Sequence, residues 1–208
     1  MGLAGGLPGR ILAPVAMLVA LAACGSNSQS LSTGDPLRDL ITLDQLVVPD
    51  FIVTSAATHV DALVLAGGDA ALASTLAHDG VQSAARVEYQ RNVDFGTSNG
   101  PIDVVATVER FSATGGAASA YSATVRQLDA IAGGVAASTG PLGDEAHSIS
   151  VVRTTTGGLQ AVEIALVWRV SNLVNVIVAR GRYGGTRLDD ALVLAGVQTQ
   201  NESRPAAG

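Results

Sequence analysis

The sequence predicts an α+β fold, in which helices pack against an antiparallel sheet of about five strands. Five short segments alternate apolar and polar residues, as strands with one buried face do. Between them lie stretches whose apolar residues recur at steps of three and four, the spacing of a helix that buries one side. Short turns join the strand segments. We therefore expect a hairpin and a three-stranded meander, packed by two to four helices.

The first half of this domain should contain two helices and the hairpin. Asp35 and Asp69 are suitable helix N-caps, and Gly80 suits a helix end. Pro49 lies in an apolar, β-branched segment and places that segment at a sheet edge. The expected elements are a short helix from 36 to 40, an extended segment from 46 to 54, a helix from 70 to 78, and hairpin strands within 85–93 and 101–111.

The second half should contain the strongest helix, the meander and a final helix. Tyr121, Val125 and Leu128 repeat at helical spacing. Thr186 and Asp189 are three residues apart, as in a capping box. The expected elements are a helix from 115 to 132, strands at 148–153, 159–170 and 173–181, and a helix from 186 to about 200.

The last two strands have a predictable register. If Ser171-Asn172 is a two-residue turn, Glu163 lies opposite Arg180, and Trp168 lies opposite Asn175. The opposite charges of Glu163 and Arg180 support this pairing. One face of the two strands is apolar and should lie against helices: Ile164, Leu166, Trp168, Val170, Leu173 and Ile177. The other face is also unusually apolar, with Ala165, Val167, Val174, Val176 and Val178, so either helices cover it too or it contacts a partner or ligand.

Composition and charge exclude some classes of protein. Apolar residues make up 48% of the 208 residues, enough for a core and not typical of a disordered chain. All basic residues are arginines, and the net charge is −6. An acidic domain without a basic run repels a phosphate backbone, so we expect no nucleic-acid partner. A single cysteine excludes a disulfide framework within the chain.

The N-terminus is typical of a bacterial secretion signal. Arg10 precedes an apolar run from 11 to 23. Thirteen helical residues extend about 20 Å, short of the roughly 30 Å hydrocarbon core of a bilayer. Pro14 would also disturb a permanent membrane helix. Residues 1–23 are therefore predicted to be a signal peptide.

The run ends in Leu21, Ala22, Ala23 and Cys24, which resembles the lipobox of bacterial lipoproteins. The resemblance implies cleavage before Cys24 after recognition of Leu21, Ala22 and Ala23, and diacylation of the Cys24 thiol. Several acyl chains hold a protein on a membrane firmly, whereas one holds it marginally. The alternative is an ordinary secreted protein with a free cysteine, which would be liable to oxidation.

The remaining chain divides into a tether, one domain and a tail. Residues 24–35 contain the lipidated cysteine and a Gly/Ser-rich stretch without periodicity, typical of a flexible tether. Residues 36–200 should form the single α+β domain. Residues 201–208 are polar and Gly/Pro-containing, and are expected to be disordered. The lipid anchor would place the domain on the outer face of the cell membrane.

Residues with catalytic or binding chemistry are few and scattered. No serine-nucleophile elbow, phosphate-binding loop or paired-histidine zinc motif occurs. Asp144 and Glu145, beside His147, could hold a cation, although solvated loop acids are the simpler interpretation. Arg180 and Arg182 share a strand face and could hold an anion, although pairing with Glu163 and nearby acids is the simpler interpretation. His59 and His78 are interpreted as surface residues, as is His147. We expect no catalytic residue, metal or cofactor.

The heptapeptide DALVLAG occurs twice, at 61–67 and 190–196. The match stops immediately on both sides, and most of its residues are Ala, Leu and Val. Either a diverged duplication or a biased composition explains it.

The order hairpin, helix, meander, helix, with Phe-Ser-Ala at 111–113 before the helix, resembles the PsbP-like lipoproteins of actinobacterial envelopes. The resemblance implies a non-catalytic auxiliary or binding role, and it assigns no site residue. The sequence therefore favours a membrane-anchored extracytoplasmic lipoprotein that binds an envelope protein or a small ligand. The alternatives are a tethered envelope enzyme such as a hydrolase, and a carrier of an apolar envelope molecule.

Overall fold

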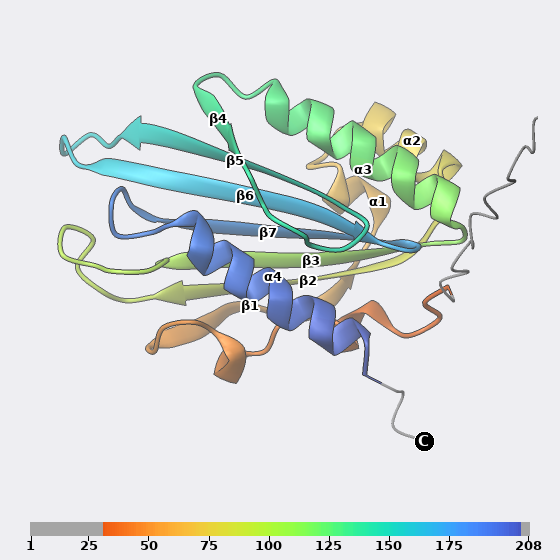
Figure 1. Cartoon of the computed structure of the whole chain (residues 1–208), viewed down its shortest axis with the longest axis horizontal. Coiled ribbons are helices and arrows are strands. Elements are labelled where there is room, and N and C mark those ends of the chain that lie inside the picture. Colours follow the sequence, from red (N-terminus) through yellow and green to blue (C-terminus); the bar gives the residue numbers. More distant parts are fainter. Residues whose placement is uncertain (1–30, 205–208) are drawn as a thin grey trace, which may run out of the picture.

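The computed structural model describes residues 31–204, which form one seven-stranded antiparallel sheet with helices on both faces (Figure 1). The strand order is β1-β2-β3-β7-β6-β5-β4. The meander β5-β6-β7 therefore joins the three-stranded unit β1-β2-β3 through a β3–β7 pairing. The strands are β1 (Phe51–Val60), β2 (Val81–Arg91), β3 (Asp103–Phe111), β4 (Gly134–Ala137), β5 (Glu145–Thr154), β6 (Gln160–Val170) and β7 (Leu173–Arg182).

The helices divide between the two faces of the sheet. The long C-terminal helix α4 (Leu188–Glu202) lies across one face, together with the 3-10 turns η1 (Pro36–Arg38) and η2 (Leu43–Gln45). The other face carries α3 (Thr114–Asp129) and the short helices α1 (Ala62–Leu65) and α2 (Ala70–His78). The α+β class is confirmed, and each face of the sheet has its own apolar core.

The expectation of about five strands was too low by two. The extended segment expected at 46–54 overlaps only the start of β1. This ten-residue edge strand begins at Phe51, and its side chains are mostly exposed. Because little of β1 is buried, its sequence lacks the alternation that reveals a strand. The other missed strand, β4, has only four residues, Gly-Val-Ala-Ala, which contain no bulky side chain besides valine. Both missed strands lie at the sheet edges.

The final helix is shifted relative to the prediction. It begins at Leu188 rather than Thr186, because the buried Thr186 hydroxyl donates to the Gly100 carbonyl at 2.9 Å. The carboxylate of Asp190, rather than Asp189, accepts the hydrogen bond from the backbone N–H of the helix-capping residue, at 2.8 Å. The helix ends at Glu202, so the first two residues of the expected tail 201–208 are helical.

The β6–β7 register is the one that a Ser171-Asn172 turn predicts. Glu163 lies opposite Arg180, and Trp168 lies opposite Asn175. Trp168 is fully buried under α4, and its indole N–H donates to the Thr199 hydroxyl at 3.0 Å. The two repeated heptapeptides have different settings, since residues 61–67 span the short α1 and its end whereas residues 190–196 lie within α4.

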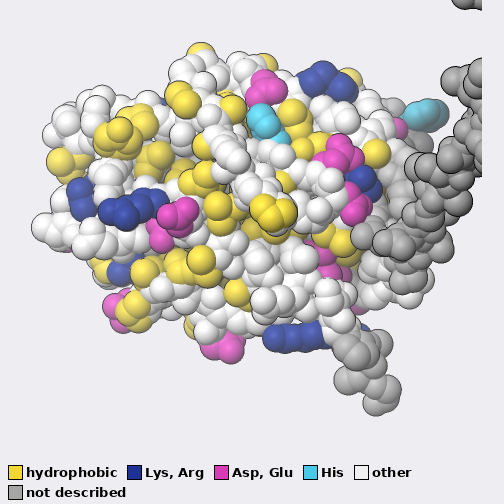
Figure 2. All heavy atoms as spheres, viewed as in Figure 1, with side chains coloured by type: hydrophobic (Ala, Val, Ile, Leu, Met, Phe, Trp, Pro, Cys, Tyr) yellow, Lys and Arg dark blue, Asp and Glu magenta, His cyan; other side chains and the backbone are white. Residues whose placement is uncertain are grey.

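Both sheet faces are only partly covered. On the α4 side, hydrophobic side chains remain visible beside the helix (Figure 2). Val135, Val152 and Tyr183 are among the exposed apolar residues of the chain. On the opposite side, α1, α2 and α3 leave a hollow over the middle of the sheet, which is the candidate functional site.

Candidate functional site

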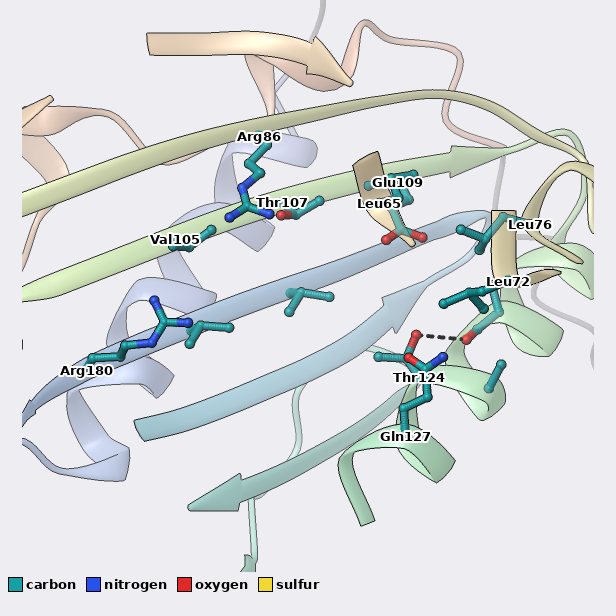
Figure 3. Close-up of a pocket in the computed structure, with 14 residues that line it drawn as sticks. Leu65, Leu72, Leu76, Arg86, Val105, Thr107, Glu109, Thr124, Gln127 and Arg180 are labelled. Atoms are coloured by element: carbon teal, nitrogen blue, oxygen red, sulfur yellow. Dashed lines mark hydrogen bonds between the residues drawn. The ribbon is translucent and has the colours of Figure 1, made fainter. Parts of the chain in front are cut away.

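A cavity of about 240 Å³ lies between the sheet and the helices α1, α2 and α3 (Figure 3). Strands β2, β3 and β7 form its floor, and the helices form its walls. Its lining is mixed, with eight apolar and six polar or charged residues: Leu65, Leu72, Leu76, Arg86, Val105, Thr107, Glu109, Ala120, Ala123, Thr124, Gln127, Val176, Val178 and Arg180. A concave site that combines apolar walls with convergent polar groups is a candidate for small-ligand binding.

Side chains alternate between the two faces of a strand, and this alternation determines which polar residues of the floor face the cavity. Val105, Thr107 and Glu109 are two residues apart in β3 and therefore share one face. The pairing of neighbouring strands brings Arg86 of β2 opposite Thr107, and Arg180 of β7 opposite the start of β3. The cavity thus has an arginine-bearing part and a Glu109 part along one sheet face (Figure 3).

Glu109 is the most unusual group in the cavity. Its side chain is only 8% exposed, and its Oε2 atom is buried without a hydrogen-bond partner. Its cross-strand neighbours, Ala84 and Val174, offer no charge or donor. Burial therefore raises the pKa of Glu109 to about 7, from an ordinary value of 4.5. Burial thus keeps this carboxyl protonated to a higher pH than is usual for glutamate, and nothing in the described chain supplies a partner for Oε2.

The two arginines of the cavity are already neutralised by acids. Arg86 donates to Glu88, with an Nη2–Oε1 distance of 2.8 Å. Arg180 Nε contacts Glu163 at 2.6 Å, and its Nη1 contacts Asp103 at 2.9 Å. The predicted pair Glu163 and Arg180 therefore belongs to a three-residue ion network that spans β3, β7 and β6.

The helical pair α1–α2 forms one wall. The Asp61 carboxylate caps α1 by accepting from the Val64 N–H at 2.9 Å. The Asp69 carboxylate caps α2 through the N–H groups of Ala71 and Leu72. Between the caps, Gly67 and its neighbour adopt positive φ angles that permit a tight connection. These local signals direct Leu65, Leu72 and Leu76 toward the cavity.

Close packing fixes α2 against α3. A Cβ on Gly116 of α3 would collide with the backbone carbonyl of Asp79 at the end of α2. The Asp79 carboxylate also accepts from the Ser119 hydroxyl of α3 at 2.9 Å. The missing side chain at Gly116 therefore allows the two helices to enclose one end of the cavity.

The residues considered for cation binding have protein partners. Arg169 contacts Asp144 at 3.0 Å and Glu145 at 2.8 Å. Asp144 also accepts from the Ser171 backbone N–H at 2.7 Å. The distance between His147 Nε2 and Asp129 Oδ1 is 2.9 Å. Within residues 31–204, no group of three or more His, Cys, Asp or Glu side chains is arranged to hold a metal.

The other sequence candidates also lie apart from the cavity. Arg182 binds the Ser98 carbonyl and the Asn99 side chain, so the expected pairing of Arg182 with an acid is wrong. His59 is 3.4 Å from the Asp35 carboxylate and lies on the edge strand. His78 is the last residue of α2 and is exposed. Of the predicted site residues in the described range, only Arg180 lines the cavity.

Sequence reasoning missed Glu109 because its setting depends on distant helices. The face of β3 that carries Val104 and Val108 was expected to be the buried one. Glu109 lies on the other face, which was expected to be partly exposed to solvent. Leu76 of α2 and Ala120 of α3 instead enclose it. In the sequence, Glu109 is followed directly by Arg110, which makes it look like part of a solvated charged pair.

A second cavity of about 860 Å³ lies at the end of the sheet where the described chain begins and ends. It contains two buried carboxyl groups. Burial raises the pKa of Asp39 to about 6 and that of Glu202 to about 8, and each lacks a close cationic partner strong enough to offset burial. Leu31 and Arg204 line this cavity and border the undescribed termini, so its outline also depends on chain outside the described range.

The described part of the expected tether is docked on this end of the sheet. The Ser32 backbone makes two hydrogen bonds with the Asn172 side chain. The Arg110 guanidinium donates to the carbonyls of Thr33 and Gly34, at 2.6 and 3.0 Å. Residues 32–34 of the expected tether are therefore fixed to the domain.

Cys24 and the signal-peptide residues lie outside the described residues. Within the described range, no helix has both the length and the apolarity needed to cross a bilayer.

Comparisons with known proteins are sparse. No protein-family profile matches the chain, and no curated protein sequence is significantly similar to it. Among solved structures, the extracellular domain of PknH from Mycobacterium tuberculosis is similar, with a TM-score of 0.48 and 12% sequence identity, over 75% of this chain and 84% of that chain.

Proposed function

We propose that this protein is a lipid-anchored, extracytoplasmic bacterial lipoprotein whose folded domain binds a small ligand in the cavity around Glu109 without catalysing a reaction. The single observation that carries the binding role is the buried, unpartnered carboxyl of Glu109 in a cavity with a mixed apolar and polar lining. A buried polar atom without a partner costs about 1–3 kcal/mol. A ligand that supplies the missing partner recovers this free energy on binding.

The lipobox and the docked N-terminal segment together support an anchored domain. Cys24 is seven residues before Leu31, the first described residue. Seven extended residues reach at most about 25 Å. Because Ser32 is held on Asn172 at the β6–β7 turn, the anchor would keep this end of the sheet next to the membrane.

A non-catalytic role is supported by the ion pairing and the position of the candidate polar groups. The acids Asp144 and Glu145 both contact Arg169, so each is engaged in an ion pair. His147 lines neither of the two cavities described in residues 31–204. A tethered hydrolase is therefore the weaker alternative.

A carrier of an apolar envelope molecule is the second candidate function. It is favoured by the leucine and valine walls of the cavity. The volume of about 240 Å³ is below the roughly 300–1,000 Å³ of typical small-molecule sites. The cavity would therefore enclose a compact molecule, or one end of a longer one, and not a complete lipid.

The anchor is tested by a Cys24→Ala substitution. Mass spectrometry of the mature wild-type protein should show an N-terminal Cys24 that carries acyl chains, and the protein should fractionate with membranes. Cys24→Ala should lose the acylation and the membrane association. A mature wild-type protein without acyl chains, or cut at another position, would contradict the proposal.

The binding role is tested by filling the cavity. Ala123 lines it from α3, whereas the adjacent Ser122 is exposed. Native mass spectrometry of protein isolated from its own membrane should show a bound small molecule in the wild type and in the matched control Ser122→Phe, and none in Ala123→Phe. Equal occupancy in both folded variants would place the ligand elsewhere and overturn the cavity assignment.

A further inference from the structure

We propose that the ligand of the Glu109 cavity is a compact apolar molecule with one amine group, and that its ammonium pairs with the Glu109 carboxylate. This inference rests on the proposed function, since it names the chemical class of ligand for the same site. Three features support this inference: the unpartnered carboxyl of Glu109, the charged groups around the cavity, and the volume of the cavity.

The first feature is that Glu109 Oε2 lacks a hydrogen-bond donor. Glu109 Oε2 is buried without a hydrogen bond, and the side chain lines the cavity. An ammonium offers three N–H donors, and a charge-assisted hydrogen bond is about twice as strong as a neutral one. Thr107, on the same strand face, and Thr124, on α3, bring further hydroxyl oxygens that can accept a second N–H.

The surrounding charge favours a cation over an anion. Arg86 and Arg180 are the cationic residues that line the cavity. Three carboxylates contact them: Glu88, Glu163 and Asp103. These three acids do not line the cavity, but two positive charges against three negative ones leave neither arginine as an unpaired cation for an anionic ligand. An ionised Glu109 is then the unpaired charge in the cavity, and it attracts an ammonium and repels a carboxylate.

The size limits the apolar body. The cavity volume of about 240 Å³ is below the roughly 300–1,000 Å³ of typical small-molecule sites, so it suits a compact ligand. A C6 alkylamine is a ligand of this kind. Its chain would lie against Val105, Val176 and Val178 of the floor, or against the leucines of α1 and α2.

Binding of an amine should depend on pH through Glu109. Burial raises the pKa of Glu109 to about 7, so the protonated form, which lacks the charge to attract an ammonium, dominates at lower pH. Among the described residues, the charged groups that line the cavity besides Glu109 are Arg86 from β2 and Arg180 from β7. Helices α1, α2 and α3 contribute leucines, alanines, Thr124 and Gln127. Amine binding should therefore strengthen as pH rises through 7.

The test compares three probes of equal chain length: n-hexylamine, hexan-1-ol and hexanoate. Titration calorimetry at pH 8 should show hexylamine binding at least tenfold more tightly than hexan-1-ol, with hexanoate weakest. At pH 5.5 the preference for the amine should fall below about threefold. NMR titration of the Glu109 carboxyl carbon should show that hexylamine lowers its pKa.

Two variants identify the responsible group. Glu109→Gln should keep hexan-1-ol binding and lose the preference for the amine. Asp189→Asn removes one exposed acid on the α4 side and should keep that preference, so a general effect of net charge is excluded. An amine preference that survives in Glu109→Gln, or tighter binding of hexanoate than of hexylamine, would overturn the inference.

The outcomes also separate this inference from the proposed function. If hexan-1-ol or hexanoate binds in the cavity while hexylamine has no advantage, the amine assignment fails and the binding role stands. If none of the three probes binds at millimolar concentration, and the isolated protein carries no small molecule, both fail.

Discussion

The Asn172 side chain holds the backbone of Ser32, although 140 residues separate them. The Ser32 N–H donates to Asn172 Oδ1 at 2.7 Å, and Asn172 Nδ2 donates to the Ser32 carbonyl at 3.0 Å. The same Nδ2 also donates to the Phe111 carbonyl at 2.8 Å. One amide therefore connects the entering N-terminal segment, the end of β3 and the β6–β7 turn.

Replacing this amide should release the N-terminal segment. Asn172→Ala removes all three hydrogen bonds and should lower the free energy of unfolding by about 1–3 kcal/mol. Amide exchange of residues 32–35 should accelerate while the sheet stays protected. Ser32→Ala is the matched control, because only the backbone of Ser32 takes part, and it should leave exchange unchanged. Equal exchange in Asn172→Ala and the wild type would contradict the role of this residue.

The turn between β6 and β7 contains a strained residue. Ser171 has a φ of 54°, in the left-handed region that favours glycine, and its buried hydroxyl has no partner. Ser171→Gly should relieve both features and raise the free energy of unfolding by about 0.5–1 kcal/mol, seen as a higher urea midpoint. Ser171→Ala removes only the hydroxyl and should gain less. A loss of stability in the glycine variant would show that the backbone is not strained there.

Glu109 should make the protein less stable as pH rises. Its folded pKa of about 7 is above the ordinary 4.5, so its ionisation favours the unfolded state as pH rises from 4.5 to 7. Below 4.5 this penalty is absent, and above 7 it is complete, on the order of 2–3 kcal/mol. Urea denaturation should therefore find Glu109→Gln close to the wild type at pH 4 and more stable by that amount at pH 8.

The control for this pH dependence is Glu88→Gln. Glu88 is partly exposed and paired with Arg86, so its loss should change stability by less than about 1 kcal/mol. If the advantage of Glu109→Gln were the same at pH 4 and pH 8, Glu109 would not be the titrating group.

Two neighbouring glycines of α3 should respond oppositely to alanine. A Cβ on Gly116 meets the Asp79 carbonyl, whereas a Cβ on Gly115 meets open space. Gly116→Ala should destabilise the fold by about 1–3 kcal/mol by pushing α2 away from α3. Gly115→Ala should be neutral or stabilise it by up to about 1 kcal/mol. Thermal unfolding measures both, and equal effects would contradict the close contact of the two helices.

Much of the architecture could be predicted because local signals were strong. Asp69 as an N-cap and the alternation around Ile164 predicted elements that the structure contains. Turn chemistry at Ser171-Asn172 was enough to predict which residues of β6 and β7 face each other. The edge strand β1 was predicted only in part, as the extended segment at 46–54, and β4 was not predicted, because an exposed or very short strand carries little periodic pattern.

The α+β class and the β6–β7 register could be predicted from the sequence, since each depends on residues close together in the chain, and attachment at Cys24 stays a prediction. Only the tertiary structure decided that Glu109 is buried without a partner, that Arg180 joins Glu163 to Asp103, and that the segment before η1 is docked on Asn172. These features arise where segments as many as 140 residues apart meet. Burial and charge pairing depend on which groups pack together, and no local pattern of residues encodes that.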